Sequence, residues 1–298
     1  MKNKKTSTAG FTCFTRACAS VEEDTRLRGA DDMAQVFLPG FARVIMKIPF
    51  LRRYFMRHIA PPGIYEYVIV RTKIFDRIFL QGLTEGVKQI VILGAGMDSR
   101  ALRFSNRNKG TRIFEVDLPE VQNPKREILQ RKKIALPSEL VFVAMDFDQQ
   151  DLSEELHKSG YDPEKRTLFL WEGICMYLQA KSVDRMFAFI KDHSGAGSEI
   201  LFDFVRASVI RKEHTLFGEE QIYRTVESTG EGWMFGIDEY SLASYLSKRG
   251  FKLVRHYTSE EMQKKFLTAE DGSDLGRING THHIAHARMS NKNFKEKK

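Results

Sequence analysis

The sequence predicts an α/β fold around a parallel, doubly wound sheet, and two observations lead to this prediction. From residue 66 onward, five short apolar segments alternate with segments of helical spacing. The first apolar segment ends in Gly94-Ala95-Gly96, and the second ends in Glu115-Val116-Asp117. Because each right-handed crossover between parallel strands needs a covering helix, this alternation favours a parallel sheet. A chain of 298 residues is long enough to bury one large domain of this kind.

The segment before this alternation, residues 11–60, is predicted to be helical but irregular. Prolines break it at positions 39, 49, 61 and 62. Its part 41–60 is both apolar and basic. A helix on a membrane surface is one interpretation. Since Pro49 interrupts the amphipathic period, we expect instead a cap segment that packs its apolar face on the core, without stable membrane association.

The start of the chain is predicted to be a structured helix and not a secretory signal. The stretch TSTAGFTCFTRACAS is mostly small and polar and contains Arg16. A signal peptide needs an apolar segment of about 7–15 residues there. The three cysteines, Cys13, Cys18 and Cys175, cannot all pair and form no CxxC motif, so we interpret them as reduced thiols in a cytoplasmic protein.

The core begins with a helix over 66–83, where apolar residues recur every three or four positions. Strands are then expected at 90–94, 111–117, 140–146, 167–172 and 199–205. Helices are expected between them at 98–107, 119–133, 149–159 and 180–192. The rhythm fails for about thirty residues after 205 and resumes with a helix at 238–249 and strands at 251–257 and 281–288. We interpret the interruption as an insertion at the carboxyl end of the fifth strand, where open α/β sheets place their ligands.

The positive charge of the chain does not indicate a nucleic-acid partner. The formal net charge is +8, but residues 1–5 carry three lysines and residues 291–298 carry four lysines against one glutamate. The part between these ends is therefore nearly neutral, and we expect the ends themselves to be solvated tails. A dedicated basic surface for nucleic acid is not predicted.

The glycine turn and the acidic residues around it indicate a cationic, adenosyl-bearing ligand. Gly94 and Gly96 allow the backbone to approach a ligand at a helix N-terminus. A dinucleotide motif would have a third glycine where this chain has Ser99. Asp98 would face the ligand from the turn, which is unfavourable for a pyrophosphate and favourable for a sulfonium. The predicted ligand is S-adenosylmethionine.

Acidic residues also end the next three strands of the predicted sheet. Asp117 follows Gly96 by 21 residues, at the position where a carboxylate accepts hydrogen bonds from ribose hydroxyls. Asp146 ends the third strand, within reach of an adenine amino group, and Glu172 ends the fourth. Any one of them could be an ordinary solvated strand end. Together with Asp98 of the glycine turn, they make four acids at matching positions, which ordinary solvated strand ends explain much less well.

On these motifs the chain resembles the leucine carboxyl methyltransferase family, and more closely its bacterial branch of S-adenosylmethionine-dependent methyltransferases, which includes polyketide carboxyl O-methyltransferases. The resemblance is carried by TAGFTCFTRACASVEED, VIVRTKIFD, VILGAGMDSRALRF, FEVDLPEV, AMDFDQQDL and LFLWEGICMYL. It is weaker after residue 205. It implies a class I methyltransferase (Rossmann-like) fold.

The resemblance also implies roles for single residues. Arg71 would meet the methionine carboxylate of the cofactor, and Asp117 would bind its ribose. Asp146 and Phe147 would lie at the adenine, and Glu172 would lie beside the methionine moiety. A guanidinium at position 71 suits this role independently, because it matches a carboxylate in a two-pronged geometry.

The N-terminal cap is implied to contribute one basic residue. Arg16 is the candidate, with Thr15 as its neighbour. We expect a single domain. Its parts are a helical cap at 1–62, a cofactor-binding core at 63–205, an inserted lid at 206–237 and a C-terminal part of the core sheet at 238–298.

We expect an O-methyltransferase that acts on a carboxylate of a small, partly apolar acid. A carboxylate is ionised at neutral pH and needs no general base, whereas a phenol would benefit from one. Tyr177 could orient the acceptor oxygen. In the inserted segment, Arg206, Arg211, His214 and Arg224 are candidates to bind an acidic group of the acceptor.

Other interpretations remain open at this point. His282 and His286 would share one face of a strand while His283 points the other way, so no metal site is expected. An S-adenosylmethionine-binding protein without catalysis would have the same cofactor residues. An NAD(P)-dependent oxidoreductase would need the missing third glycine, and a nucleic-acid methyltransferase would need a different motif after the fourth strand than WEGICMY. The sequence indicates no oligomeric state.

Overall fold

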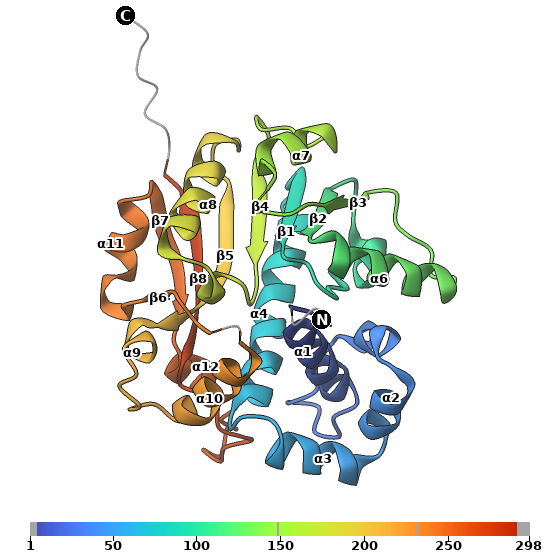
Figure 1. Cartoon of the computed structure of the whole chain (residues 1–298), viewed down its shortest axis with the longest axis vertical. Coiled ribbons are helices and arrows are strands. Elements are labelled where there is room, and N and C mark those ends of the chain that lie inside the picture. Colours follow the sequence, from blue (N-terminus) through green and yellow to red (C-terminus); the bar gives the residue numbers. More distant parts are fainter. Residues whose placement is uncertain (1–4, 148, 231, 291–298) are drawn as a thin grey trace, which may run out of the picture.

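The computed structural model describes residues 5–147, 149–230 and 232–290, and these residues form the predicted α/β fold (Figure 1). The two lysine-rich ends, 1–4 and 291–298, lie outside the described residues, so the expectation that they are solvated tails stays a prediction.

The sheet has eight strands in the order β3-β2-β1-β4-β5-β8-β7, and the short β6 pairs with β5. Strands β1 to β5 run parallel to one another, whereas β8 is antiparallel to both β5 and β7. The strands are β1 Gln89–Leu93, β2 Arg112–Asp117, β3 Leu140–Ala144, β4 Thr167–Trp171, β5 Glu199–Arg206, β6 Gly236–Ile237, β7 Phe251–Tyr257 and β8 His282–Met289. All seven strands expected from the sequence are present. The antiparallel insertion of β8 and the two-residue β6 were not expected.

The central strands are buried on both faces, which explains why they read as continuous apolar runs. In β1, Ile90 and Ile92 pack on one face together with α4, while Val91 and Leu93 pack on the other. Side chains alternate across a strand, so two separate apolar layers form. Helices α4, α10 and α12 contribute to the first layer, and α7, α8 and α11 contribute to the second.

The helices broadly follow the predicted ranges, with two differences. The helix expected at 98–107 is a short helix followed by the 3-10 turn Ser105–Arg107, and the helix expected at 238–249 begins with the 3-10 turn Glu239–Ser241. The α-helices are α1 Lys5–Ser20, α2 Gly40–Lys47, α3 Pro49–His58, α4 Ile64–Thr84, α5 Arg100–Arg103, α6 Pro119–Arg131, α7 Leu152–Lys158, α8 Ala180–Asp192, α9 Ala207–Ile210, α10 Glu219–Thr229, α11 Leu242–Ser247 and α12 Ser259–Phe266. Further 3-10 turns lie at Asp32–Phe37 and Cys175–Tyr177.

The N-terminal helices α1, α2 and α3 gather beyond the carboxyl ends of the central strands, in the lower part of Figure 1. As predicted, the first described residues form a helix, α1, and Pro49 divides 41–60 into two helices. The expectation that 41–60 packs its apolar face on the core is only half right. Ala42 and Met46 are buried against α1, but Phe41 and Phe50 are 72% and 74% exposed.

The three cysteines are unpaired and buried, and burial raises the pKa of each thiol. Within the described parts of the chain, every helix is too short or too polar to cross a bilayer.

Candidate functional site

The register of the sheet brings the glycine turn and two of the predicted acids to one edge. Leu93, the last residue of β1, pairs with Val116 of β2 on one side and with Trp171 of β4 on the other. The residues that follow these three are Gly94, Asp117 and Glu172. They therefore leave the sheet side by side at its carboxyl edge, as their spacing predicts.

Both glycines of the turn adopt the left-handed conformation, with φ of +62° at Gly94 and +50° at Gly96. A Cβ at Gly94 would lie 2.6 Å from the side chain of Ile174. The backbone N–H of Gly96 donates to Asp117 Oδ2 over 2.5 Å, and that of Leu118 donates to Asp117 Oδ1 over 2.7 Å. Asp117 thus links the end of β2 to the turn after β1, and its carboxylate is held in one orientation.

Asp98 is buried beside the turn, and the structure changes the interpretation of its role. Its Oδ1 accepts the backbone N–H of Arg100 over 2.7 Å, and its Oδ2 forms a close ion pair with the guanidinium of Arg100. Burial alone would raise the pKa of Asp98, but the charge of Arg100 overrides this and the pKa is lowered. Asp98 was expected to face the ligand directly. Here both its oxygens hold Arg100.

Arg71 reaches the same edge from the middle of α4. Its Nε lies 3.0 Å from Glu172 Oε1, and its Nη1 donates to Asp203 Oδ2 over 2.7 Å. Asp203, in β5, is fully buried and also accepts from the hydroxyl of Tyr67 at 2.8 Å and from the backbone N–H of Gly173 at 2.6 Å. Burial alone would lower the pKa of Arg71, but Asp203 and Glu172 raise it, so the guanidinium stays charged.

Arg100 extends these contacts into a continuous buried network. It pairs with Glu172 at 2.8 Å and with Asp76 of α4 at 2.8 Å. Arg103 pairs with Asp76 at 2.7 Å and lies 3.3 Å from Asp31. We call this set the ion-pair network; its members are Arg16, Asp31, Arg71, Asp76, Asp98, Arg100, Arg103, Glu172 and Asp203.

Arg16 connects the N-terminal helix to the network, which places it where the predicted cap residue should be. Its Nη2 donates to the carbonyl oxygen of Met97, inside the glycine turn, over 2.7 Å, and its Nη1 lies 3.0 Å from Asp31 Oδ2. Thr15, the neighbouring candidate, is fully buried and donates to the carbonyl oxygen of Phe11 within α1. Of the two, Arg16 is the one that contacts the turn.

Sequence reasoning missed five members of the network: Asp31, Asp76, Arg100, Arg103 and Asp203. Asp203 left a readable signal, because it is a charged residue in the middle of the apolar strand LFDFV. An acid at such a position is almost never fully buried unless it is paired. The other four stand in loops or predicted helices, where a charged residue is ordinary.

Asp146 and Phe147 follow β3 at the same edge, one strand further out than Asp117. Asp146 is half-buried, and its Oδ2 accepts from the side-chain amide of Gln149 over 2.9 Å. Phe147 is 40% exposed. An exposed aromatic ring beside a half-buried carboxylate is an arrangement that can contact a purine.

The residues predicted to bind the acceptor are not brought together. Arg206 pairs with Glu239, whereas Arg211 and Arg224 are exposed and pair with different glutamates on the surface. His214 is exposed and has a left-handed φ of 52°. Tyr177 is half-buried and packs against the apolar layer that contains α4. Of these five, Tyr177 and Arg206 are the two that are partly buried.

The histidines of β8 have separate partners. His282 stacks on Tyr67 with 4.5 Å between ring centroids, His283 lies 3.0 Å from the ring of His256, and His286 contacts Glu199 at 2.7 Å. Among the described residues, no group of three or more metal-ligating side chains gathers.

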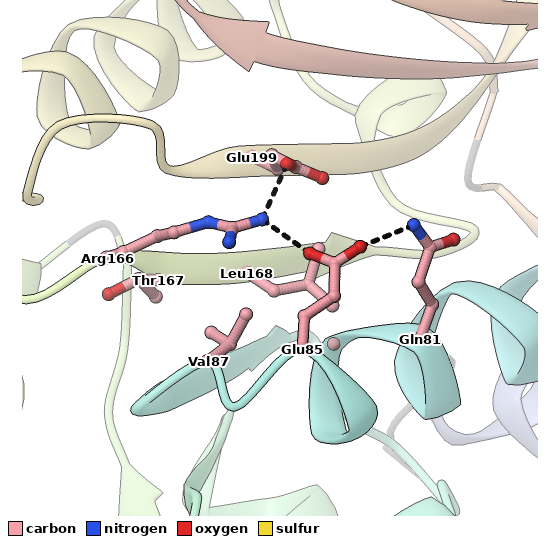
Figure 2. A pocket seen from close by; sticks show the side chains of 8 residues that line it. Gln81, Glu85, Val87, Arg166, Thr167, Leu168 and Glu199 are labelled. Atoms are coloured by element: carbon pink, nitrogen blue, oxygen red, sulfur yellow. Dashed lines mark hydrogen bonds and ion pairs between the residues drawn. The ribbon is translucent and has the colours of Figure 1, made fainter.

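A small hollow lies at the opposite edge of the sheet, where β1, β4 and β5 begin (Figure 2). Arg166 spans it, 2.9 Å from both Glu85 and Glu199, and Gln81 donates to Glu85. Since these side chains bind one another and lie at the amino ends of the strands, the hollow is separate from the glycine turn.

Comparisons with known proteins agree with the geometry of the carboxyl edge. The model of the family described as leucine carboxyl methyltransferase matches residues 9–191. A candidate S-adenosyl-L-methionine-dependent methyltransferase of Mycolicibacterium paratuberculosis is 33% identical over 51% of this chain and 53% of its own length. A similarly named protein of Streptomyces avermitilis is 37% identical over 45% of this chain and 46% of its own. The chain thus spans about half the length of the curated relatives that it matches.

Two solved structures share the fold over nearly the whole chain. A candidate methyltransferase from Thermobifida fusca has a TM-score of 0.60 at 16% identity and covers 95% of this chain and 98% of its own. A DUF574 family protein from Streptomyces avermitilis has a TM-score of 0.59 at 12% identity and covers 93% and 97%.

Proposed function

Because the chain belongs to the leucine carboxyl methyltransferase family, we propose that it is an S-adenosylmethionine-dependent O-methyltransferase that acts on the carboxylate of a small, partly apolar acid. The observation that carries the proposal is the carboxyl edge of the sheet, where Gly94, Asp117 and Glu172 leave adjacent strands in register and Arg71 reaches Glu172 from α4.

The residues at this edge fit the chemistry of the cofactor. Each carboxylate oxygen has two lone pairs, so Asp117 can accept from backbone N–H groups and from ribose hydroxyls together. Asp146 and Phe147 would contact the adenine. The nearest contacts of Arg71 with Glu172 and Asp203 are made through its Nε and Nη1. Its Nη2 would donate to the methionine carboxylate.

The charge of the network also suits a sulfonium. Five carboxylates outnumber four guanidinium groups by one. The network is buried, so screening by water is weak and this single excess negative charge acts on the edge with more force than it would on the surface. A pyrophosphate would be repelled there, which argues against a dinucleotide.

When bound, S-adenosylmethionine supplies a methyl group that is already electrophilic. The chain then has to position the acceptor in line with the methyl group and exclude water. Helix α1 supports the second task, because Ala9 lies over Gly96 and Arg16 is bonded to Met97. An ionised carboxylate acceptor needs no base, and Tyr177 would orient its oxygen.

We expect a partly apolar acceptor because the inserted segment carries apolar side chains close to Tyr177. Trp233 and Phe235 are buried, and the backbone N–H of Met234, between them, donates to the carbonyl oxygen of Met176 next to Tyr177. Arg206 of this segment is partly buried, and its guanidinium is bound to Glu239. We expect it to limit acceptors to small acids.

The test is calorimetric titration with S-adenosylmethionine, S-adenosylhomocysteine and NADPH, followed by a turnover assay that detects S-adenosylhomocysteine. We expect both adenosyl compounds to bind and NADPH to give no signal. Asp117→Asn should abolish adenosyl binding, whereas Glu127→Gln should not. Glu127 is an exposed carboxylate on α6 and serves as the matched control.

The turnover assay then distinguishes an enzyme from a protein that only binds the cofactor. Small apolar carboxylic acids and phenols of similar size should be compared. Turnover of the acids alone supports the carboxylate assignment. Turnover of the phenols alone would refute it, and binding without any turnover across both panels would favour a non-catalytic role.

A further inference from the structure

Helices α2 and α3 and the residues that follow them expose a cluster of large apolar side chains. We call it the α2–α3 patch. Its apolar members are Phe41, Val44, Ile48, Phe50, Leu51, Tyr54 and Ile59, which are 37–74% exposed. They are seven of the twelve large apolar side chains exposed among the described residues, within 19 positions of the chain. Such a concentration marks an interaction surface, because single exposed apolar residues are normally scattered.

The apolar side chains of the patch lie at helical spacing, so they form a stripe. In α2, Phe41, Val44 and Ile48 are three and four positions apart. In α3, the rings of Phe50 and Tyr54 stack with 6.5 Å between centroids, and Tyr54 contacts His58 at 4.8 Å. The stripe points away from the core, because the opposite face of the hairpin already packs on α1 through Ala42, Met46, Phe55 and Met56.

The charges carried by the stripe's own segment have one sign. Residues 40–59 contain five arginines and lysines and no aspartate or glutamate. Arg52 is buried beside Glu22, and Arg53 pairs with Glu23. The other three, Arg43, Lys47 and Arg57, have no ion pair among the described residues.

We propose that the α2–α3 patch binds the surface of an anionic lipid bilayer. An interfacial helix buries an apolar face with Phe and Leu at the boundary of the head groups while Lys and Arg meet the anionic lipids. The patch has both parts, and the long basic side chains at its border can extend to the head groups while their stems lie on apolar surface. Neither helix is long enough to span a bilayer, so the contact is peripheral.

A protein partner or a second copy of this chain would suit the patch less well. A partner protein or a second copy would have to present acidic residues to the three unpaired cations of the patch. Without such acids the cations would be buried unpaired in the interface, which is costly. Head groups meet them while leaving them hydrated. This complementarity of charge decides for the bilayer.

The experiment is co-sedimentation of the full chain with phosphatidylcholine vesicles that do or do not contain phosphatidylserine. We expect binding to the anionic vesicles and its loss at high ionic strength. Phe41→Ser combined with Phe50→Ser should weaken binding about tenfold or more, since each ring leaves the interface. Lys47→Gln combined with Arg57→Gln should weaken it roughly 25-fold, at about fivefold for each cation.

Matched controls separate the patch from general surface properties. Tyr240→Ser removes an aromatic ring outside the patch that is 92% exposed. Lys248→Gln removes an exposed cation directly after α11, also outside the patch. Both should bind as the unmodified chain does. All altered side chains are exposed, so thermal unfolding monitored by circular dichroism should be unchanged in every variant.

The remaining outcomes overturn the proposal. Vesicle binding that survives the serine substitutions but disappears with salt would mean that the lysine-rich ends bind the vesicles. Absence of vesicle binding together with a dimer that Phe50→Ser dissociates, measured by light scattering, would mean that a second copy covers the patch. Absence of both would mean that the patch has another partner.

Discussion

Replacing Arg71 by methionine should destabilise the fold as well as the cofactor site. Asp203, fully buried, would keep only the hydroxyl of Tyr67 and the backbone N–H of Gly173 as partners. Removing one member of a buried pair leaves an uncompensated charge and typically costs about 3–5 kcal/mol. Urea unfolding followed by tryptophan fluorescence would measure this, since Trp171 lies in the buried core.

A second substitution separates the two effects of Arg71→Met. Asp203→Asn removes the unpaired charge, and the double variant should recover about 2 kcal/mol or more of the lost stability. It should not recover affinity for S-adenosylmethionine, because the methionine carboxylate would still lack its guanidinium, a loss of about 2–3 kcal/mol. Arg224→Met, at an exposed pair with Glu220, serves as the control and should cost less than about 1 kcal/mol.

The result that would refute this reasoning is specific. If Arg71→Met unfolds within about 1 kcal/mol of the unmodified chain, the burial of Asp203 does not depend on its ion pair. If the double variant binds the cofactor as tightly as the unmodified chain, Arg71 does not contact the methionine carboxylate and acts only within the network.

Two further predictions concern the glycine turn and pH. Gly94→Ala should abolish cofactor binding because its Cβ would meet Ile174 at 2.6 Å, whereas Gly86→Ala, at a similar φ of +70° but with open space around it, should bind normally. Equal affinity of the two variants for the cofactor would contradict the tight packing of Gly94 against Ile174 at the turn. Burial, with the nearby charge of Arg71, lowers the pKa of His282 to about 3, and burial with its histidine neighbours lowers that of His283 to about 2. Both stay neutral in the folded state while the unfolded chain takes up protons below its ordinary pKa of about 6.5, so stability is full above that pH and falls below it. When the pH falls from about 7.5 to about 5.5, the two histidines together should lower the free energy of unfolding by about 3 kcal/mol. His282→Phe should halve this loss, which urea titrations at the two pH values would measure. An unchanged pH dependence would show that His282 is not neutral in the fold.

The sheet was predictable from the sequence because its strands obey a local rule. Each central strand is buried on both faces and therefore appears as an uninterrupted apolar run, and the helices between them have their own period. The position of β8 is different. Its antiparallel pairing with both β5 and β7 depends on how the last segment returns to the sheet, which the sequence of the strand does not specify.

The candidate site was predictable in part for the same reason. Gly94, Asp117 and Glu172 follow strand ends, so register alone brings them together. Arg16, Asp31 and Asp203 join the ion-pair network through contacts with residues of other elements, and no spacing in the sequence reveals such contacts. The division of 41–60 into two helices was readable from Pro49, but which apolar side chains would remain exposed was not, because both faces of the hairpin are apolar.

The ion-pair network connects these observations, because it joins the N-terminal helices to the sheet at the place where the cofactor would bind. Asp31 contacts Arg16 of α1 and lies near Arg103, and Asp76 of α4 contacts Arg100 and Arg103. Buried ion pairs add little net stability, since well-packed apolar side chains of similar size are often as stable or more so. A role in stability alone therefore does not account for nine charged residues beside the glycine turn, seven of them buried and two partly buried. Fixed charges would suit the proposed site, which would hold a sulfonium, a carboxylate and an acceptor in one geometry without reorganising.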